Sequence, residues 1–239
     1  MEWLNRYDKV PTLEISGQDI RVAVKRHPRA KRLTMRIAPD GSEIRVTMPR
    51  WGQSADAVEF ARSRTSWIEK QLAQIAPLIV PRAGEIFAYR GTDITIAWDE
   101  NHPRTPKLGD EALHIGGPAE NLGARIERWL RSEALRIMQA DLAYYCTAAD
   151  VEAPKLGLSR AQRRWGSCST SGVVRMNWRL IMAPDDVRRS VVSHEVAHLV
   201  QFDHSREFHT LLGDIFEGDM TSANRWLKEH GRSLYRQFG

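Results

Sequence analysis

Two histidines and one glutamate in the chain have a spacing that suits metal-assisted hydrolysis. The run His194-Glu195-Val196-Ala197-His198 places its histidines four residues apart. On a helix such residues are separated by about 40° around the axis and by one turn along it, so both imidazoles can reach one cation. Glu195 projects about 60° from His198, where it can accept a proton from a metal-activated water molecule. The pattern predicts a zinc-dependent hydrolase with Glu195 as general base.

His204 is the candidate for the third metal ligand. Catalytic zinc sites use three protein ligands and leave a further position open. His204 follows His198 by six residues, a step that would turn it about 240° away from the metal in a continuous helix. The helix must therefore end between them, and Asp203 or Ser205 can cap the next helix. We predict one zinc ion per chain, bound by His194, His198 and His204.

The histidines have two other interpretations, in which they carry out no chemistry. They could be hydrogen-bonded residues of a buried helix, or they could belong to a closed structural zinc site. A closed site needs a fourth ligand, for which His209 is the nearby candidate, and it leaves Glu195 without a role. We expect His209 to lie outside the ligand set, beside the site or on the surface of the following helix. Cys168 could be a fourth ligand, a nucleophile or an inert thiol, and the inert thiol is favoured because the metal already activates water.

Residues 158–165 and 173–180 predict a pair of strands just before the metal-binding helix. The edge of such a pair could receive a peptide substrate through main-chain hydrogen bonds. Arg164, Trp165 and Asn177 are therefore candidate substrate residues, together with His209. Trp165 is more typical of a core anchor, and Asn177 could either steady an oxyanion or tie a turn.

The patterns around these motifs predict an α+β fold, with a β-rich N-terminal part and a mostly helical C-terminal part. Alternating or β-branched residues predict strands at 20–24, 32–37, 43–48, 86–89, 94–98, 112–115, 158–165 and 173–180. Helical spacing predicts helices at 54–75, 119–149, 184–201, 205–216 and 222–230. Turn residues at 39–42 separate two of the strands, and the segment 166–172 supplies the loop of a short hairpin before the metal-binding helix.

The domain boundary is expected at Gly116-Gly117-Pro118, where turn residues interrupt the pattern. We predict a β-rich N-terminal region at 1–117 and a catalytic domain at 118–239.

The composition is that of an ordinary globular protein. The 239 residues include 42% hydrophobic and 27% charged residues, enough for a sizeable core. No apolar run approaches the roughly 18 residues of a membrane helix, and the first residues lack the pattern of a signal peptide. Two cysteines are too few for a disulfide framework and predict free thiols. We therefore expect a cytoplasmic protein.

The net charge is +5, and much of the excess lies in the basic cluster between Arg21 and Arg36. Such a cluster could attract nucleic acid. A solvated strand face and turn is the favoured interpretation, because no recognised nucleic-acid motif accompanies the charge.

Several motifs resemble those of the YgjP-like metallopeptidase domain family, relatives of the SprT-like zinc proteases. The matching elements are R-W-G-S-C-S (164–169), G-V-V-R-M-N-W-R-L (172–180), A-P (183–184), V-V-S-H-E-V-A-H-L (191–199), H-S-R-E-F (204–208), K-R-L-T-M-R-I (31–37) and P-D-G (39–41). The resemblance covers most of the chain and implies a zincin-type catalytic domain with His194, His198 and His204 as ligands. The chain departs from the family at His209, where a bulky aromatic is usual, and at 217–221, where a proline is common. These departures affect the expected substrate cleft and none of the expected ligands.

Three functions fit these residues. The favoured one is a metallopeptidase that hydrolyses peptide bonds with metal-activated water. The second is a zinc-dependent hydrolase of nucleotide phosphoanhydrides, because arginine suits bidentate phosphate contacts, although the chain has no Walker loop. The arginines that motivate it are Arg160, Arg163, Arg164, Arg175 and Arg179. The third is a non-catalytic zinc module that binds nucleic acid through the Arg21–Arg36 cluster.

Overall fold

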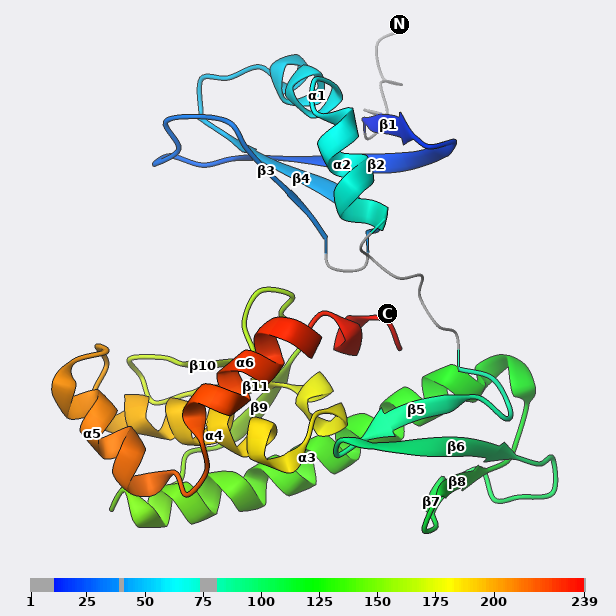
Figure 1. Cartoon of the computed structure of the whole chain (residues 1–239), viewed down its shortest axis with the longest axis vertical. Coiled ribbons are helices and arrows are strands. Elements are labelled where there is room, and N and C mark those ends of the chain that lie inside the picture. Colours follow the sequence, from blue (N-terminus) through cyan, green and yellow to red (C-terminus); the bar gives the residue numbers. More distant parts are fainter. Residues whose placement is uncertain (1–10, 39–40, 74–80, 239) are drawn as a thin grey trace, which may run out of the picture. The chain divides into compact units, whose positions relative to one another are not determined.

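The computed structural model describes residues 11–38, 41–73 and 81–238 (Figure 1). Contacts divide the chain into two compact units, residues 1–77 and 78–239. Part of the predicted turn at 39–42 and the end of the predicted helix at 54–75 lie outside the described residues. The predicted α+β class is confirmed, because β-sheets precede a mostly helical C-terminal part.

The first unit is a four-stranded sheet with two helices on one face. Its strands, in the spatial order β1-β2-β4-β3, are β1 (Thr12–Ile15), β2 (Gln18–Arg26), β3 (Thr34–Ile37) and β4 (Glu43–Met48). β2 and β4 are parallel, and the other neighbouring strands are antiparallel. Every second residue of β4 is fully buried, as the two-residue period of a strand requires when one face is covered. The covered face packs against the helices α1 (Ser54–Arg62) and α2 (Thr65–Ala73).

These two short helices replace the single helix that the sequence predicts at 54–75, so that prediction is wrong at residues 63–64. The Ser63 hydroxyl donates to the carbonyl of the residue three positions earlier at 3.0 Å. The Thr65 hydroxyl makes the same type of bond at 2.8 Å. Such bonds satisfy the carbonyls without a continuing helix, and apolar spacing alone does not reveal them.

The second unit begins with another four-stranded sheet, in the order β5-β6-β8-β7. Its strands are β5 (Ile86–Tyr89), β6 (Thr92–Trp98), β7 (Lys107–Leu108) and β8 (Ala112–Ile115). A short 3₁₀ turn, η1 (Ala119–Asn121), leads from this sheet into the long helix α3 (Leu122–Ala148).

The predicted boundary between residues 117 and 118 falls inside the second unit. Phe87 and Leu113 of the sheet belong to the same buried cluster as Ile126 of α3. The turn after β5 also contacts later parts of the chain, because the Arg90 N–H donates to the Ile181 carbonyl at 2.8 Å. The glycines at 116–117 form a local turn between the β5–β8 sheet and α3, which share one core. Turn residues in the sequence do not indicate whether the elements on either side pack together.

A three-stranded sheet precedes the metal-binding helix, in the order β10-β11-β9. Its strands are β9 (Leu156–Ser159), β10 (Gly166–Cys168) and β11 (Val174–Asn177), and η2 (Trp178–Met182) follows as a 3₁₀ segment. β10 and β11 form the expected hairpin, whereas β9 pairs with β11 in parallel. The predicted strand limits at 158–165 and 173–180 are wrong, because β10 lies within the segment predicted as the loop. The β9–β11 pairing joins residues far apart in sequence, so a local pattern cannot show it.

Three helices complete the second unit. They are α4 (Asp185–Val200), α5 (Arg206–Ile215) and α6 (Met220–His230), followed by the 3₁₀ segment η3 (Ser233–Tyr235). The limits of α4 and α5 lie within one residue of the predicted ones, and α6 begins two residues earlier than predicted.

Polar contacts, as well as the shared core, hold α4 against α3. Arg188 is 2% exposed, and its Nε donates to the Asp141 carboxylate of α3 at 2.8 Å. The same guanidinium forms an ion pair with Asp185 in the first turn of α4. Arg189 donates from Nε to the Tyr145 hydroxyl of α3 at 2.9 Å. These contacts hold the helix that carries two of the three candidate metal ligands, His194 and His198.

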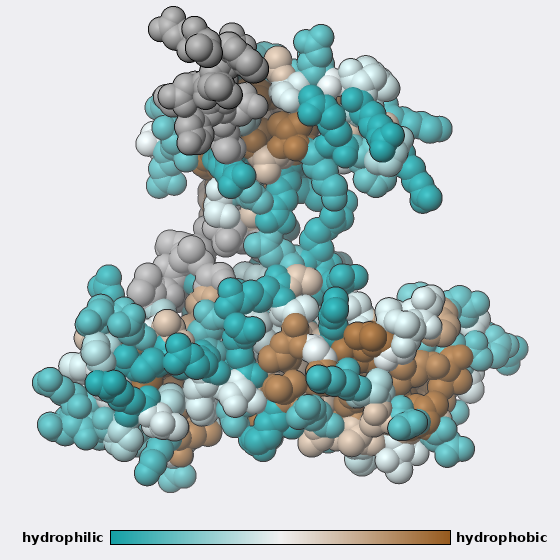
Figure 2. All heavy atoms as spheres, turned by 180° about the vertical axis from the view of Figure 1, so that it is seen from behind, coloured by the Kyte–Doolittle hydropathy of each residue, from teal (hydrophilic) through white to brown (hydrophobic). Residues whose placement is uncertain are grey.

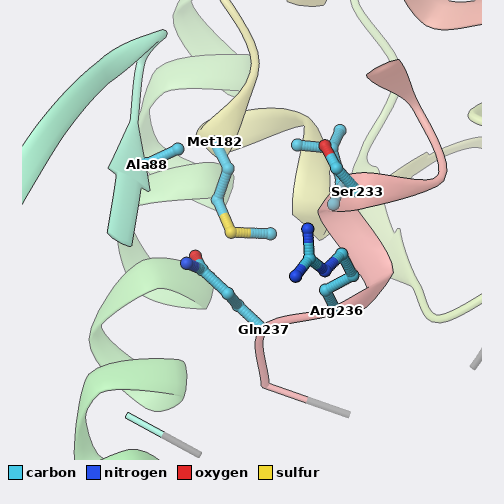
Figure 3. Close-up of a pocket in the computed structure, with 6 residues that line it drawn as sticks. Ala88, Met182, Ser233, Arg236 and Gln237 are labelled. Atoms are coloured by element: carbon cyan, nitrogen blue, oxygen red, sulfur yellow. The ribbon is translucent and has the colours of Figure 1, made fainter. Parts of the chain in front are cut away.

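A pocket of about 110 Å³ lies where the C-terminal segment packs against β5 and η2 (Figure 3). Met182 and Arg236 point toward one another across it. Gln237 closes one side and donates from Nε2 to the Ile86 carbonyl at 3.2 Å. None of the candidate metal ligands lines this pocket.

Within the described part of the chain, no helix combines the length and apolar character needed to cross a bilayer. Hydrophilic side chains cover most of the visible face of the first unit in Figure 2. The large apolar side chains that remain exposed are scattered, and Trp51, Tyr144 and Phe202 are among the most exposed of them.

Replacing Asp141 by alanine should strongly destabilise the second unit. The change leaves the buried Arg188 guanidinium without its α3 partner, and we expect a loss on the order of 3 kcal/mol in the free energy of unfolding. Urea denaturation of the full chain measures this loss. The control is Arg136→Ala, which removes an exposed ion pair with Glu133 on the same helix and should cost less than about 1 kcal/mol. Equal losses in the two variants would contradict the anchoring role of the buried pair.

Candidate metal centre

The positions at which α4 begins and ends determine where the candidate ligands lie. Asp185 and Asp186 occupy its first turn, where negative charge favours the positive end of the helix dipole. The helix ends at Val200, and Gln201 adopts an extended backbone. The chain can therefore leave the helix before His204, as the sequence predicts.

The next helix begins immediately after His204. Ser205 is its N-cap, and the Ser205 hydroxyl accepts a hydrogen bond from the Phe208 N–H. This cap fixes the first turn of α5 directly after the connection of residues 201–205. The connection brings His204 back toward the side of α4 that carries the first two histidines, and α5 follows α4 in the fold (Figure 1).

The imidazoles of His194, His198 and His204 converge. One ring nitrogen from each residue lies within 4.8 Å of the others, a spacing at which all three can hold a metal ion. The Nε2 atoms of His194 and His204 are 3.4 Å apart. The ring centroids of His198 lie 4.8 Å from those of both other histidines. The structure therefore brings together the three residues that the sequence selected.

Phe208 forms the floor beneath the three imidazoles, a role that the sequence analysis missed. Its side chain is fully buried, and its ring centroid lies 5.0, 4.6 and 4.9 Å from those of His194, His198 and His204. The sequence signal that could have identified Phe208 is Ser205, three residues earlier. As the N-cap, Ser205 fixes where α5 begins, and Phe208 then faces inward. A buried aromatic ring limits the orientations that the imidazoles can adopt.

The end of α4 also orients His198. The His198 Nδ1 lies 3.0 Å from the Gln201 carbonyl oxygen, which can only accept a hydrogen bond. Nδ1 therefore carries the proton, and Nε2 is left with a free lone pair. Metal-binding histidines are commonly oriented by a second hydrogen bond of this kind.

The electrostatic environment keeps His194 neutral. Burial and the neighbouring histidines lower the pKa of His194 to about 4. An imidazole must be neutral to offer its lone pair to a metal ion, so this environment favours ligation over protonation near neutral pH.

Glu195 lies in a narrow space between α4 and β10. It is 6% exposed, and burial raises its pKa to about 7, opposed by the Cys168 backbone N–H and by the positive charge of Arg164. Gly166 provides the space on the strand side, because a Cβ there would overlap the Oε1, Cγ and Cδ atoms of Glu195. A carboxylate with a pKa near neutrality can both accept and release a proton.

Asn177 is one of the candidate substrate residues, and the fold uses its amide fully. It is fully buried, and its Nδ2 donates to the Ala161 carbonyl at 2.7 Å and to the Tyr235 hydroxyl at 3.0 Å. Its Oδ1 accepts from the Arg179 N–H at 3.1 Å. Of the two roles that the sequence left open, the contacts are those of a residue that ties a turn.

The remaining candidates differ in their burial and in their neighbours. Trp165 is half-buried and packs on Tyr235 with ring centroids 5.4 Å apart. Arg164 is exposed and acts on Glu195 through its charge. His209 is exposed, 6.4 Å from His204 between ring centroids, and lies outside the group of three.

Cys168 is half-buried, and burial and the Glu195 charge raise the pKa of its thiol. A raised pKa leaves little thiolate at neutral pH, which agrees with an inert thiol.

Phe208→Ala should destabilise the site region by about 3–5 kcal/mol, because it leaves a cavity beneath three packed imidazoles. The measurement is the free energy of unfolding in urea. Phe202→Ala is the matched control, since this ring is 52% exposed and its removal should cost less than about 1 kcal/mol. A small effect at Phe208 would show that the imidazoles do not depend on this floor.

Comparison with protein families matches the YgjP-like metallopeptidase domain over residues 31–230. No curated protein and no solved structure matches the chain. The matched range covers most of both units and includes the three converging histidines, Glu195 and the β10–β11 hairpin. The family is one of metallopeptidases and implies a bound metal, which the three imidazoles could hold. The chain therefore belongs to the YgjP-like metallopeptidase domain family.

Proposed function

We propose that this protein is a zinc-dependent metallopeptidase in which His194, His198 and His204 bind the metal and Glu195 is the general base. The observation that supports it most directly is the convergence of three imidazoles beside a buried carboxylate whose pKa is raised to about 7. A structural site would have no use for such a carboxylate.

The donor set fits zinc. Three neutral nitrogen ligands are typical of catalytic zinc, and neither the Cys168 thiol nor the Glu195 carboxylate belongs to the converging group. A zinc ion held there would act as a Lewis acid toward water and toward a scissile carbonyl. We expect one ion per chain.

Glu195 performs the proton transfers in this proposal. Its carboxylate would accept a proton from water as the carbonyl is attacked and would return that proton to the leaving amine. The raised pKa suits both steps, because the group is neither too weak a base nor too weak an acid near neutral pH. The absence of a side chain at Gly166 leaves room for this carboxylate beside β10.

A peptide substrate suits the neighbouring sheet. β10 is an edge strand, with β11 on one side only, and it carries Gly166 beside Glu195. An extended peptide could pair with the outer edge of β10 and so place its backbone next to the base. Arg164 and Trp165 directly precede this strand and are the candidate substrate contacts.

The alternative activity, hydrolysis of nucleotide phosphoanhydrides, has less support. Of the arginines that motivate it, Arg160 forms an ion pair with Glu127 of α3. Arg179 is buried and lies over the Trp178 and Tyr235 rings. Two of the five guanidinium groups thus already have partners within the fold, which weakens the case for a phosphate site.

The cysteines are the basis for proposing a cytoplasmic location. Cys146 is buried, Cys168 is half-buried, and both are free thiols. Unpaired cysteines are typical of proteins from reducing compartments.

His204→Ala should remove most of the bound zinc, because two imidazoles from one helix turn leave the ion without its third protein ligand. Elemental analysis of the purified, zinc-supplied protein measures the bound metal, and the wild type should hold about one equivalent. His209→Ala is the matched control and should keep its zinc, since His209 lies outside the group. A wild type that takes up no zinc would remove the basis of the proposal.

Glu195→Gln tests the mechanism. The amide cannot act as a base, so hydrolysis of a fluorescence-quenched peptide library should fall by about 10²- to 10⁴-fold while the zinc content stays unchanged. Phosphate release from nucleoside triphosphates is measured in parallel. Full peptidase activity in the variant would disprove the assigned base, and zinc-dependent phosphate release without peptidase activity would favour the alternative hydrolase.

A further inference from the structure

The excess positive charge of the chain belongs entirely to the first unit. Residues 1–77 contain 14 Lys and Arg against 9 Asp and Glu, whereas residues 78–239 contain 21 of each. The unit with the candidate metal centre is therefore neutral overall, and the unit without it carries the whole net charge of +5. This segregation indicates that the charge serves something other than the metal centre.

The topology of the first sheet gathers part of this charge at one end. Because β2 and β4 are parallel, their carboxyl ends lie side by side, with Lys25 opposite Thr47 and Arg26 opposite Met48. The loop after β2 and the loop after β4 therefore start at the same edge of the unit (Figure 1).

Arg26 connects the two loops. Its guanidinium donates to the Gly52 carbonyl at 3.4 Å and to the Ser54 hydroxyl at 2.9 Å. The backbone adds a further contact, from the His27 N–H to the Met48 carbonyl at 2.9 Å. The loops of residues 27–33 and 49–53, together with Lys25 and Arg26 at the end of β2, thus form one surface, which we call the basic end.

The basic end carries an unneutralised charge. Its exposed cationic residues are Lys25, Arg29, Lys31, Arg32 and Arg50. None of these five forms an ion pair with any described residue of the chain. The acidic residue that follows these loops, Asp56, accepts the Gln53 N–H at 3.1 Å in the cap of α1. Clustered cations without acidic partners attract a polyanion.

The sheet face that α1 and α2 leave uncovered extends this charge. Arg36 of β3 lies directly opposite Arg45 of β4 in the antiparallel register. Like charges in this position destabilise a sheet, so a negatively charged ligand would relieve the repulsion. Arg45 has Glu43 as an ion-pair partner, whereas Arg36 has none among the described residues.

An aromatic ring stands within the basic end. Trp51 lies between Arg50 and Gly52, and 83% of it is exposed, which makes it the most exposed large apolar side chain of the described chain. A tryptophan in open solvent among arginines can stack on a nucleic-acid base while the guanidinium groups contact phosphates. Double-stranded nucleic acid offers no free base for such stacking, so the ring favours a single strand.

An anionic membrane would also attract cations next to a tryptophan. Membrane binding, however, needs an apolar face large enough to enter the lipid. Trp67, the other large exposed apolar side chain described in the first unit, lies on α2 and outside the loops of the basic end. One ring with several guanidinium groups fits a nucleic-acid strand better than a lipid surface.

We propose that the basic end of the first unit binds single-stranded nucleic acid, with Lys25, Arg29, Lys31, Arg32 and Arg50 on the phosphates and Trp51 stacked on a base. The surface belongs to the first unit and the metal centre to the second, and the proposal does not depend on the proposed peptidase activity.

Binding of the full chain to a fluorescent oligothymidylate of about 16 nucleotides, followed by fluorescence anisotropy, tests this proposal. Trp51→Ala should weaken binding about fivefold or more, because a stacking partner is lost. Trp51→Phe keeps an aromatic face and should restore most of the affinity. Equal affinity of the wild type and Trp51→Ala would overturn the assignment of the ring.

The salt dependence tests the cations. Neutralising Arg29, Lys31 and Arg32 with glutamine should reduce the slope of log K against log salt by about two. The matched control neutralises Arg62, Arg64 and Lys70, which carry the same total charge on α1, on α2 and on the link between these helices, and it should leave the slope nearly unchanged. Circular dichroism and zinc content confirm that every variant is folded.

Three results would overturn the proposal. The first is an equal loss of binding in the control, which would indicate a diffuse effect of net charge. The second is binding to phosphatidylserine vesicles without binding to the oligonucleotide, which would assign the surface to membranes. The third is the absence of any binding at low salt.

Discussion

A buried charge determines where α4 can lie, and the candidate metal centre depends on that position. Arg188 is almost completely enclosed and must keep its partners Asp141 and Asp185, since an unpaired charge in the interior is very costly. A shift of α4 by one residue would rotate it by about 100° and separate the guanidinium from α3. The same rotation would carry His194, Glu195 and His198 away from β10 and α5. The Arg188–Asp141 ion pair on one side of α4 thus fixes the rotation of α4 about its axis, and this rotation directs His194 and His198 on another side of the helix.

The features of the fold that the sequence predicted correctly are local ones. The limits of α4 follow from apolar spacing, the acidic first turn and the need for the chain to turn before His204. The features it missed depend on partners far along the chain or on competing local bonds. β10 exists because it pairs with β11, and the β5–β8 sheet joins the core of α3 through residues such as Phe87 and Ile126. The break at residues 63–64 arises from hydroxyl–carbonyl bonds that a hydrophobic pattern does not register.

The same division applies to the candidate site. Motif spacing was enough to select the three histidines, because helix geometry converts spacing into direction. It could not select Phe208 or Gly166, whose importance comes from what lies against them: three imidazole rings in one case and the Glu195 carboxylate in the other. It also could not decide the role of Asn177, because only the fold shows that Ala161, Arg179 and Tyr235 occupy its amide. Residue type and spacing identify chemical groups, and the three-dimensional packing decides whether those groups are available.

The end of α4 makes the length of one short segment critical. The Gln201 carbonyl accepts a hydrogen bond from the His198 Nδ1, and the extended backbone of Gln201 changes the direction of the chain. Four residues later, Ser205 caps the start of α5. All three features must occur within residues 199–205 for His204 to meet the other two imidazoles. An insertion or deletion in this segment would shift either the carbonyl or the cap relative to the histidines. Among related sequences, length variation should therefore be tolerated at the exposed turn of residues 169–172 but not between the second and third histidines.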